Sequence, residues 1–285
     1  MLFDYFFWVV AIGTMALGVA SAIIGTTVVL EQQSQLGDAI GHSVFPGIIV
    51  SFMLFQTRNP LILMLGAVTA GLVAFQLIQW IHRNSSFSYE SILALILSSM
   101  FGLGMVLSSY IQGNPAYQKA AQAGLNHYIM GQAAYLVKDD VRLILVVTTG
   151  VLLVFALFFP KIKLVLFDKI FAQSIGIQPQ RISQLLLVLA LLIISVGIKT
   201  VGIILVSSML VAPTVAALQW SRVYHRVIGI AGVIGLVSAF IGTYLSTAVD
   251  DLATGPTIVL CQTAFAILSL LLAPNGLLKR KRVKS

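Results

Sequence analysis

The sequence predicts an all-α, polytopic membrane protein, and three observations carry this prediction. Of the 285 residues, 59% are hydrophobic and only 9% are charged, whereas a soluble domain carries roughly a quarter charged residues. The mean hydropathy is +1.00. About nine separate apolar stretches approach or reach the ~20 residues that a helix needs to cross a bilayer. We therefore expect a multi-pass protein of the plasma (inner) membrane.

The predicted membrane-spanning helices follow one another along a single transmembrane domain, residues 1–285. Only the pair on either side of Lys199 is ambiguous, because its first member is short and a different reading of this region gives eight helices instead of nine. The apolar stretches are residues 5–30, 36–55, 60–81, 91–111, 142–159, 184–198, 200–219, 227–248 and 254–274.

The basic residues predict the orientation of the chain. The net charge is +8, and the basic residues cluster in short loops and at the C-terminus, as in Lys279–Arg282. Such clusters are typical of cytoplasmic loops held against anionic lipid, so the charge does not indicate nucleic-acid binding. With nine helices, the basic segments all fall inside if the N-terminus is outside and the C-terminus inside.

Two predicted connections are too long to be simple turns. The outer one, 112–141, is rich in Ala and Gln and is expected to form one or two short helices over the outer mouth. The inner one, 160–182, holds an amphipathic pattern that predicts a two-turn helix, which either contacts a partner or lies among lipid headgroups. Asp168 is near its start and Gly176 at its end, and its apolar positions include Phe167, Ile170, Phe171 and Ile175.

The second apolar stretch holds the strongest chemical signal, GDAIGHSVFPG at 37–47. Asp38 and His42 are four residues apart, so on a helix they project from one face. A carboxylate costs about 2.5–3.5 kcal/mol at the centre of a membrane helix, unless it faces a polar cavity or binds a cation. One carboxylate and one imidazole suit Mn, Fe or Zn. The spacing leaves two readings open, a metal site and a structural hydrogen-bonded pair.

Prolines and glycines predict where the helices can bend. Pro46 and Gly47 follow the Asp38–His42 pair and are expected to weaken the helix there, freeing backbone carbonyl groups. Pro213 is expected to kink its helix and to help a gate bend.

The GDAIGHSVFPG segment resembles the signature of the manganese/zinc/iron permease family of ABC transporters, the ABC-3 family, close to GDxxSHxxxPG. Gly41 stands where that pattern has Ser. Three further stretches resemble the family's motifs and the outer loop of its manganese-type branch. They are Phe167-Asp168 with Ala172 and Gly176, Val201-Gly202 through Ala212-Pro213, and Ala120 to Ala134.

This resemblance implies a permease with the architecture of type II ABC importers, acting as a homodimer or as one of two similar chains. Asp38 and His42 would bind the transported Mn²⁺, Zn²⁺ or Fe²⁺, with no permanently bound cofactor. The helix containing Phe167, Ile170 and Phe171 would contact a cytoplasmic ATPase subunit, which hydrolyses ATP. A metal-binding lipoprotein would dock outside over 112–141. The permease itself would catalyse no covalent step.

Two other functions remain open from the sequence. A secondary metal transporter would couple uptake to protons, and would need more acids within the membrane than the chain offers. A permease for a metal chelate or vitamin would share the architecture but has no use for an Asp–His pair. The sequence assigns no role to His127 or to Asp250 and Asp251.

Overall fold

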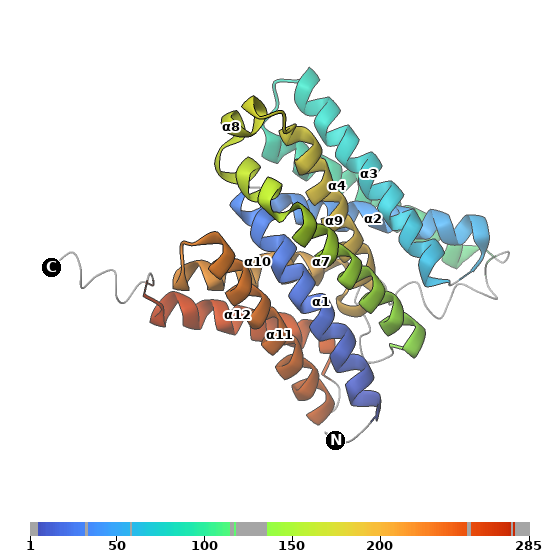
Figure 1. Ribbon diagram of the computed structural model, residues 1–285. Coiled ribbons are helices and arrows are strands. Elements are labelled where there is room, and N and C mark those ends of the chain that lie inside the picture. The colour runs from blue at the N-terminus through green and yellow to red at the C-terminus, as the bar shows by residue number, and fades with distance from the viewer. Residues whose placement is uncertain are drawn as a thin grey trace.

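All secondary structure that the computed structural model describes is helical. The structure describes residues 5–31, 34–57, 59–114, 117, 136–249, 252–274 and 276. Nine long helices and one short helix, α8, succeed one another along these segments (Figure 1). They are α1 (Tyr5–Leu30), α2 (Ser34–Phe55), α3 (Pro60–Asn84), α4 (Tyr89–Gly113), α7 (Lys138–Phe167), α8 (Lys169–Ser174), α9 (Pro179–Val201), α10 (Ile203–Trp220), α11 (Tyr224–Ala248) and α12 (Thr254–Leu272).

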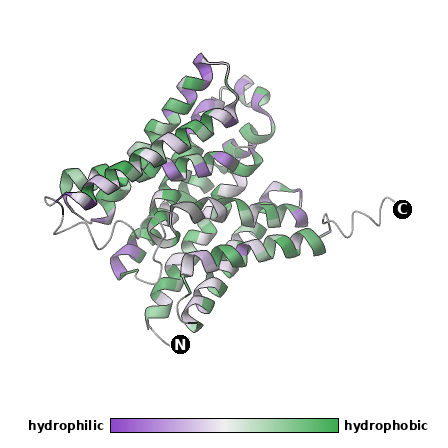
Figure 2. Cartoon of the chain, turned by 180° about the vertical axis from the view of Figure 1, so that it is seen from behind, coloured by the Kyte–Doolittle hydropathy of each residue, from purple (hydrophilic) through white to green (hydrophobic). Residues whose placement is uncertain are grey.

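The predicted all-α membrane fold is confirmed. Within the described residues, eight helices are long and apolar enough to cross a bilayer, and α10 adds a shorter apolar stretch, Val206–Trp220. Most hydrophilic residues gather at helix ends and connections, while the middles of the helices are largely hydrophobic (Figure 2). The chain is a multi-pass membrane protein.

Gly202 separates α9 from α10. This is the region in which the sequence did not decide between eight and nine helices. The φ of Gly202 is +94° and lies in a region that residues with a Cβ rarely adopt. Its backbone N–H still bonds the carbonyl of Ile198, and its carbonyl accepts from the N–H of Val206. The chain therefore changes direction at one residue without losing these backbone hydrogen bonds, and the two apolar stretches form separate helices.

The inner connection is shorter than 160–182, because α7 continues through Pro160 to Phe167. Proline removes one hydrogen bond from a helix interior, which favoured a helix end at this point. Phe155, Ile162 and Val165, on both sides of Pro160, are buried in the core and hold the helix together across it. Around the outer segment, α4 ends at Gly113 and α7 begins at Lys138. Residues 115–116 and 118–135, where one or two short helices are expected, lie outside the described part.

The helices pack as two groups. In one, α2 packs against α3 and α4; in the other, α1, α10, α11 and α12 pack together. Small residues allow close approach, since a Cβ on Gly18 of α1 would lie 2.7 Å from the carbonyl oxygen of Gly235 on α11. Helix α9 contacts both groups, and α10 is also packed against α2. The contact between α2 and α10 therefore lies at the boundary between the groups.

The predicted orientation gives a labelling experiment. Thr57 lies in the α2–α3 connection and Ser85 in the α3–α4 connection, at opposite ends of α3. With Cys261 replaced by Ala, a single cysteine at Thr57→Cys should react with an impermeant maleimide from outside. Ser85→Cys should react only after the membrane is opened, because His82 and Arg83 favour the inner side. Labelling of both positions from the same side would contradict the orientation.

Candidate functional site

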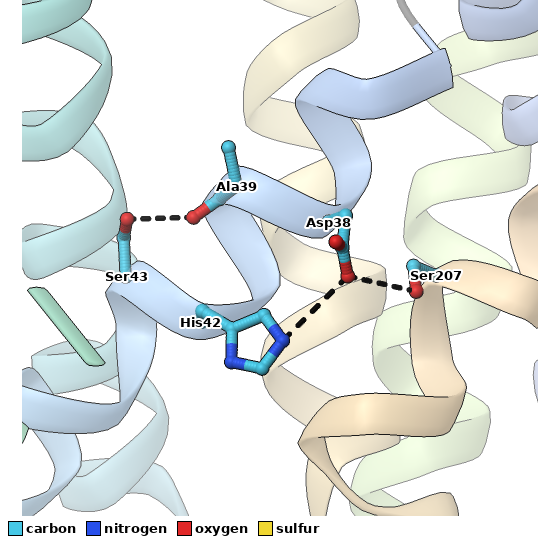
Figure 3. Close-up of polar contacts among 5 residues, drawn as sticks. All are labelled: Asp38, Ala39, His42, Ser43 and Ser207. Carbon is cyan, nitrogen blue, oxygen red and sulfur yellow. Dashed lines mark hydrogen bonds and ion pairs between the residues drawn. The ribbon is translucent and has the colours of Figure 1, made fainter. Parts of the chain in front are cut away.

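The structure brings Asp38 and His42 together on the first turns of α2 (Figure 3). Their four-residue spacing places both side chains on one face of the helix. The distance from Nε2 of His42 to Oδ1 of Asp38 is 3.6 Å, which is longer than a good hydrogen bond. The two groups face each other without being closely bonded.

Helices α10 and α4 fix the positions of the pair. Ser207 on α10 donates a hydrogen bond from Oγ to Oδ1 of Asp38 at 3.2 Å (Figure 3). On the other side, the ring of Phe101 on α4 meets the His42 imidazole edge to face, with centroids 4.9 Å apart. Ser207 thus orients the carboxylate, and Phe101 restricts the rotation of the imidazole.

The backbone around His42 is also unusual. Pro46 has no N–H, so the helix supplies no hydrogen bond to the His42 carbonyl four residues earlier. Nδ1 of His42 is buried and has no hydrogen-bond partner among the described residues. In many metal sites this second ring nitrogen donates to a carbonyl, carboxylate or water. The described helices therefore leave the second ring nitrogen of His42 without a hydrogen bond.

The pair lies at the depth of the middle of the bundle. A Cβ on Gly71 of α3 would meet Leu191 of α9 and Val44 of α2, which is two residues after His42. Gly71 and Leu191 both lie within one residue of the midpoints of their helices. At this depth the side chain of His42 is 13% exposed, but that of Asp38 is 48% exposed. A carboxylate half-exposed here must face another protein chain or water, because exposure to lipid is costly.

The arrangement could hold one divalent cation in part. Two ligand atoms of a tetrahedral ion, at about 2.0–2.2 Å from the metal, are roughly 3.3 Å apart, close to the observed separation. The described residues contain no group of three or more His, Cys, Asp or Glu side chains able to hold a metal. One chain therefore offers two side-chain ligands, and a complete coordination shell needs water, backbone oxygen or a second chain.

The expected helix of the inner connection is α8, a single six-residue helix. Oδ1 of Asp168 accepts a hydrogen bond from the N–H of Phe171 at 2.8 Å and caps its first turn. Gly176 has a φ of +83° and ends it. Ala172 is fully buried, whereas Phe167, Ile170, Phe171 and Ile175 are between 52% and 82% exposed. The helix is thus anchored on one face and presents apolar side chains on the other.

The remaining predicted site residues lie inside continuous helices. Pro46 and Gly47 are within α2, and Pro213 is within α10; neither helix ends at them. Gly47 is in close contact with the backbone of Gly66 on α3, so no larger side chain fits. Their part in a gate stays a prediction. His127, Asp250 and Asp251, together with the stretch Ala120 to Ala134, fall outside the described residues, as does the side chain of Lys199.

Sequence reasoning missed the residues that hold the pair in place, Ser207 and Phe101. Both are on helices distant in the chain from α2, so no local spacing relates them to Asp38. The only signal for Ser207 is a hydroxyl in an otherwise apolar span, and this signal is weak because serines are common in such helices.

Comparison with known proteins assigns the chain to a family. A family model described as the ABC 3 transport family matches residues 3–273. The chain is 37% identical, over 98% of its length and 95% of the relative's, to the zinc transport system membrane protein TroC of Treponema pallidum. It is 38% identical to the manganese transport system membrane protein MntC of Bacillus subtilis, covering 97% of this chain and 63% of that one.

Among solved structures, PsaBC from Streptococcus pneumoniae in complex with Fab is similar along the entire chain. The TM-score is 0.85 with 25% identity, over 100% of this chain and 97% of that one. An inward-facing structure of a putative metal-chelate type ABC transporter shares the fold, with a TM-score of 0.63 and 13% identity over 92% of this chain and 84% of that one. Because the family model covers nearly the whole sequence, the chain belongs to the ABC 3 transport family.

Proposed function

We propose that the chain is the membrane-spanning permease subunit of an ABC importer that carries manganese into the cytoplasm. The observation that carries this proposal is the Asp38–His42 pair, whose carboxylate is about half-exposed at mid-depth of the helix bundle. The chain that forms this bundle belongs to the ABC 3 transport family. Family membership does not favour a proton-coupled secondary transporter or a permease for chelates. ATP hydrolysis belongs to a separate subunit, and this chain binds and releases the ion without a covalent step.

The donor atoms support manganese over softer metals. The pair offers one imidazole nitrogen and carboxylate oxygens. Oxygen-rich sets completed by water suit Mn²⁺, whereas thiolates favour Zn²⁺ and Cu⁺. The lone cysteine, Cys261, is on α12, and Asp38 and His42 are on α2. Relatives named for manganese and for zinc transport both occur, so the order of affinities has to be measured.

A second permease chain would complete the site. Asp38 leaves 48% of its side chain uncovered at a depth where lipid would penalise a charge. A second copy, or a similar chain, facing this side would bring another carboxylate and imidazole to the same ion. The ion would then pass between two subunits rather than through one, and movement of the subunits would make or break the shell.

The exposed apolar residues of α8 suit contact with the ATPase. Ile170 is 82% exposed and lies three residues after the end of α7. The exposed side chains of α8 include Ile170 and Phe171, and Phe167 at the end of α7 adds a third, so an apolar contact with the ATPase suits this surface. On the outer side, a metal-binding lipoprotein would deliver the ion to the mouth near 112–141.

The central prediction of this function concerns the carboxylate. Asp38→Asn preserves the size and hydrogen-bonding capacity of the side chain but removes its charge, and His42→Ala removes a ligand nitrogen. Either change should abolish most manganese uptake, because water cannot replace the charge at this depth. The measurement is cell-associated manganese in a strain without other importers, normalised to permease abundance.

Glu90→Gln is the matched control, because Glu90 is an exposed acid in the first turn of α4 and its change should leave uptake near the parent level. If the Asp38–His42 pair is only structural, Asp38→Asn will transport nearly as well as the parent. Uptake above about half of the parent rate would remove Asp38 from the coordination shell.

A second prediction concerns α8. Phe171→Asp places a charge on the apolar surface of this helix and should dissociate or uncouple the ATPase while the permease stays in the membrane. Phe171→Leu keeps the surface apolar and should retain most function. Co-purification of the ATPase and metal-stimulated ATP hydrolysis are the two readouts. Normal values of both in Phe171→Asp would return α8 to the role of a helix among lipid headgroups.

A further inference from the structure

A narrow cavity begins beside the Asp38 region and runs towards the α8 end of the bundle. It is a space of about 60 Å³ between α1, α2, α3, α9 and α10. At one end are Gly37, which precedes Asp38, and Leu210, which lies about one helical turn after Ser207. At the other end is Ser183, and the stretch of α9 from Ser183 to Ile194 spans about 16 Å.

The far end of this cavity has oxygen donors, whereas its middle is apolar. Glu31, which follows α1, lines it together with Ser183 on α9 and Gln79 on α3. A single water needs roughly 10–15 Å³ of such space, so the volume admits a cation that keeps a few waters. Carboxylate, amide and hydroxyl oxygens are the donors that hard divalent cations prefer.

The Glu31 carboxyl is partly withdrawn from water. Burial raises its pKa above the usual value, while the charge of Lys169 and a hydrogen bond from Ser183 act in the opposite direction. A carboxylate in this position is stabilised by a nearby positive charge. Lys169 is the first residue of α8, so part of that charge comes from the helix we assign to the ATPase contact.

The same donors also face a larger groove. Gln79 and Ser183 line both the cavity and a groove of about 730 Å³ between α3, α8 and α9, at the α8 end of the bundle (Figure 1). Amide side chains line the groove together with Lys169, Arg83 and several apolar residues; the glutamines are Gln76, Gln79, Gln173, Gln180 and Gln184. An ion at Glu31 would therefore have polar groups ahead of it, on the side of the groove.

We propose that Glu31, with Ser183 and Gln79, forms a second cation site on the inner side of the permease, occupied by the metal after it leaves Asp38 and His42. The identity of the ion rests on the proposed function. The leucines and Ala190 between the two sites make the passage apolar, so the ion moves between them only when the helices shift.

Lys169 gives this inner site a means of release. Its ammonium group acts on the same carboxylate as the metal would, so a closer lysine lowers the affinity for a cation. Because Lys169 begins α8, movement of α8 with the ATPase changes the distance between the two charges. Weak binding at this position lets the ion leave into the groove rather than remain in the protein.

The test is equilibrium Mn²⁺ binding to the purified full-length chain in lipid nanodiscs, with free Mn²⁺ counted by its EPR signal. Asp38→Asn is the background, because it removes the central site. This variant should still bind Mn²⁺, and adding Glu31→Gln should weaken that binding at least about tenfold, since charge-assisted ligands are the strong ones. Adding Ser183→Ala, which keeps the charge, should weaken it by about threefold.

Two further variants separate a cation site from a structural ion pair. Glu90→Gln, an exposed acid at the same end of the bundle, should not change the residual binding. Lys169→Gln removes the competing ammonium and should tighten it several-fold. Equal binding with and without Glu31→Gln, or no tightening in Lys169→Gln, would overturn the inner site. Neither result bears on Asp38, whose own test is uptake in the parent background.

Discussion

A carboxylate placed at mid-depth of an apolar helix bundle constrains much of the structure around it. Asp38 would destabilise α2 in lipid, so its charge has to be met by hydrogen bonds, by water or by a cation. Ser207 on α10 supplies one hydrogen bond, and His42 lies 3.6 Å away on the same helix. Close packing of α2 on α3, through Gly47 and Gly66, keeps the helix from rotating this side chain towards lipid.

The position of the pair between two helix groups connects binding to movement. Asp38 belongs to the group of α2, α3 and α4, while Ser207 belongs to the group of α1, α10, α11 and α12. A shift of one group against the other would therefore change the hydrogen bonding of the Asp38 carboxylate. The α1–α2 connection carries Glu31 near Lys169 of α8, so the proposed ATPase contact and the proposed metal site are joined through a short stretch of chain.

The fold could be predicted from the sequence where the signal was local. Long apolar runs gave the membrane helices, and α1 has the predicted limits, 5–30. The spacing of Asp38 and His42 placed them together, because four residues make about one helical turn. Ser207 and Phe101 could not be predicted, since their contacts depend on how α10 and α4 pack. The continuation of α7 through Pro160 was missed for a related reason: buried side chains on both sides offset the lost hydrogen bond.

The central claim is that the imidazole of His42 and the carboxylate of Asp38 bind the transported ion directly. Pulsed EPR of Mn²⁺ bound to the purified permease, prepared with histidine labelled by ¹⁵N or left as ¹⁴N, detects a nitrogen bonded to the metal. The account predicts a histidine nitrogen coupling that changes with the label and disappears in His42→Ala. Bound Mn²⁺ with oxygen ligands alone, and the same spectrum in His42→Ala, would contradict it.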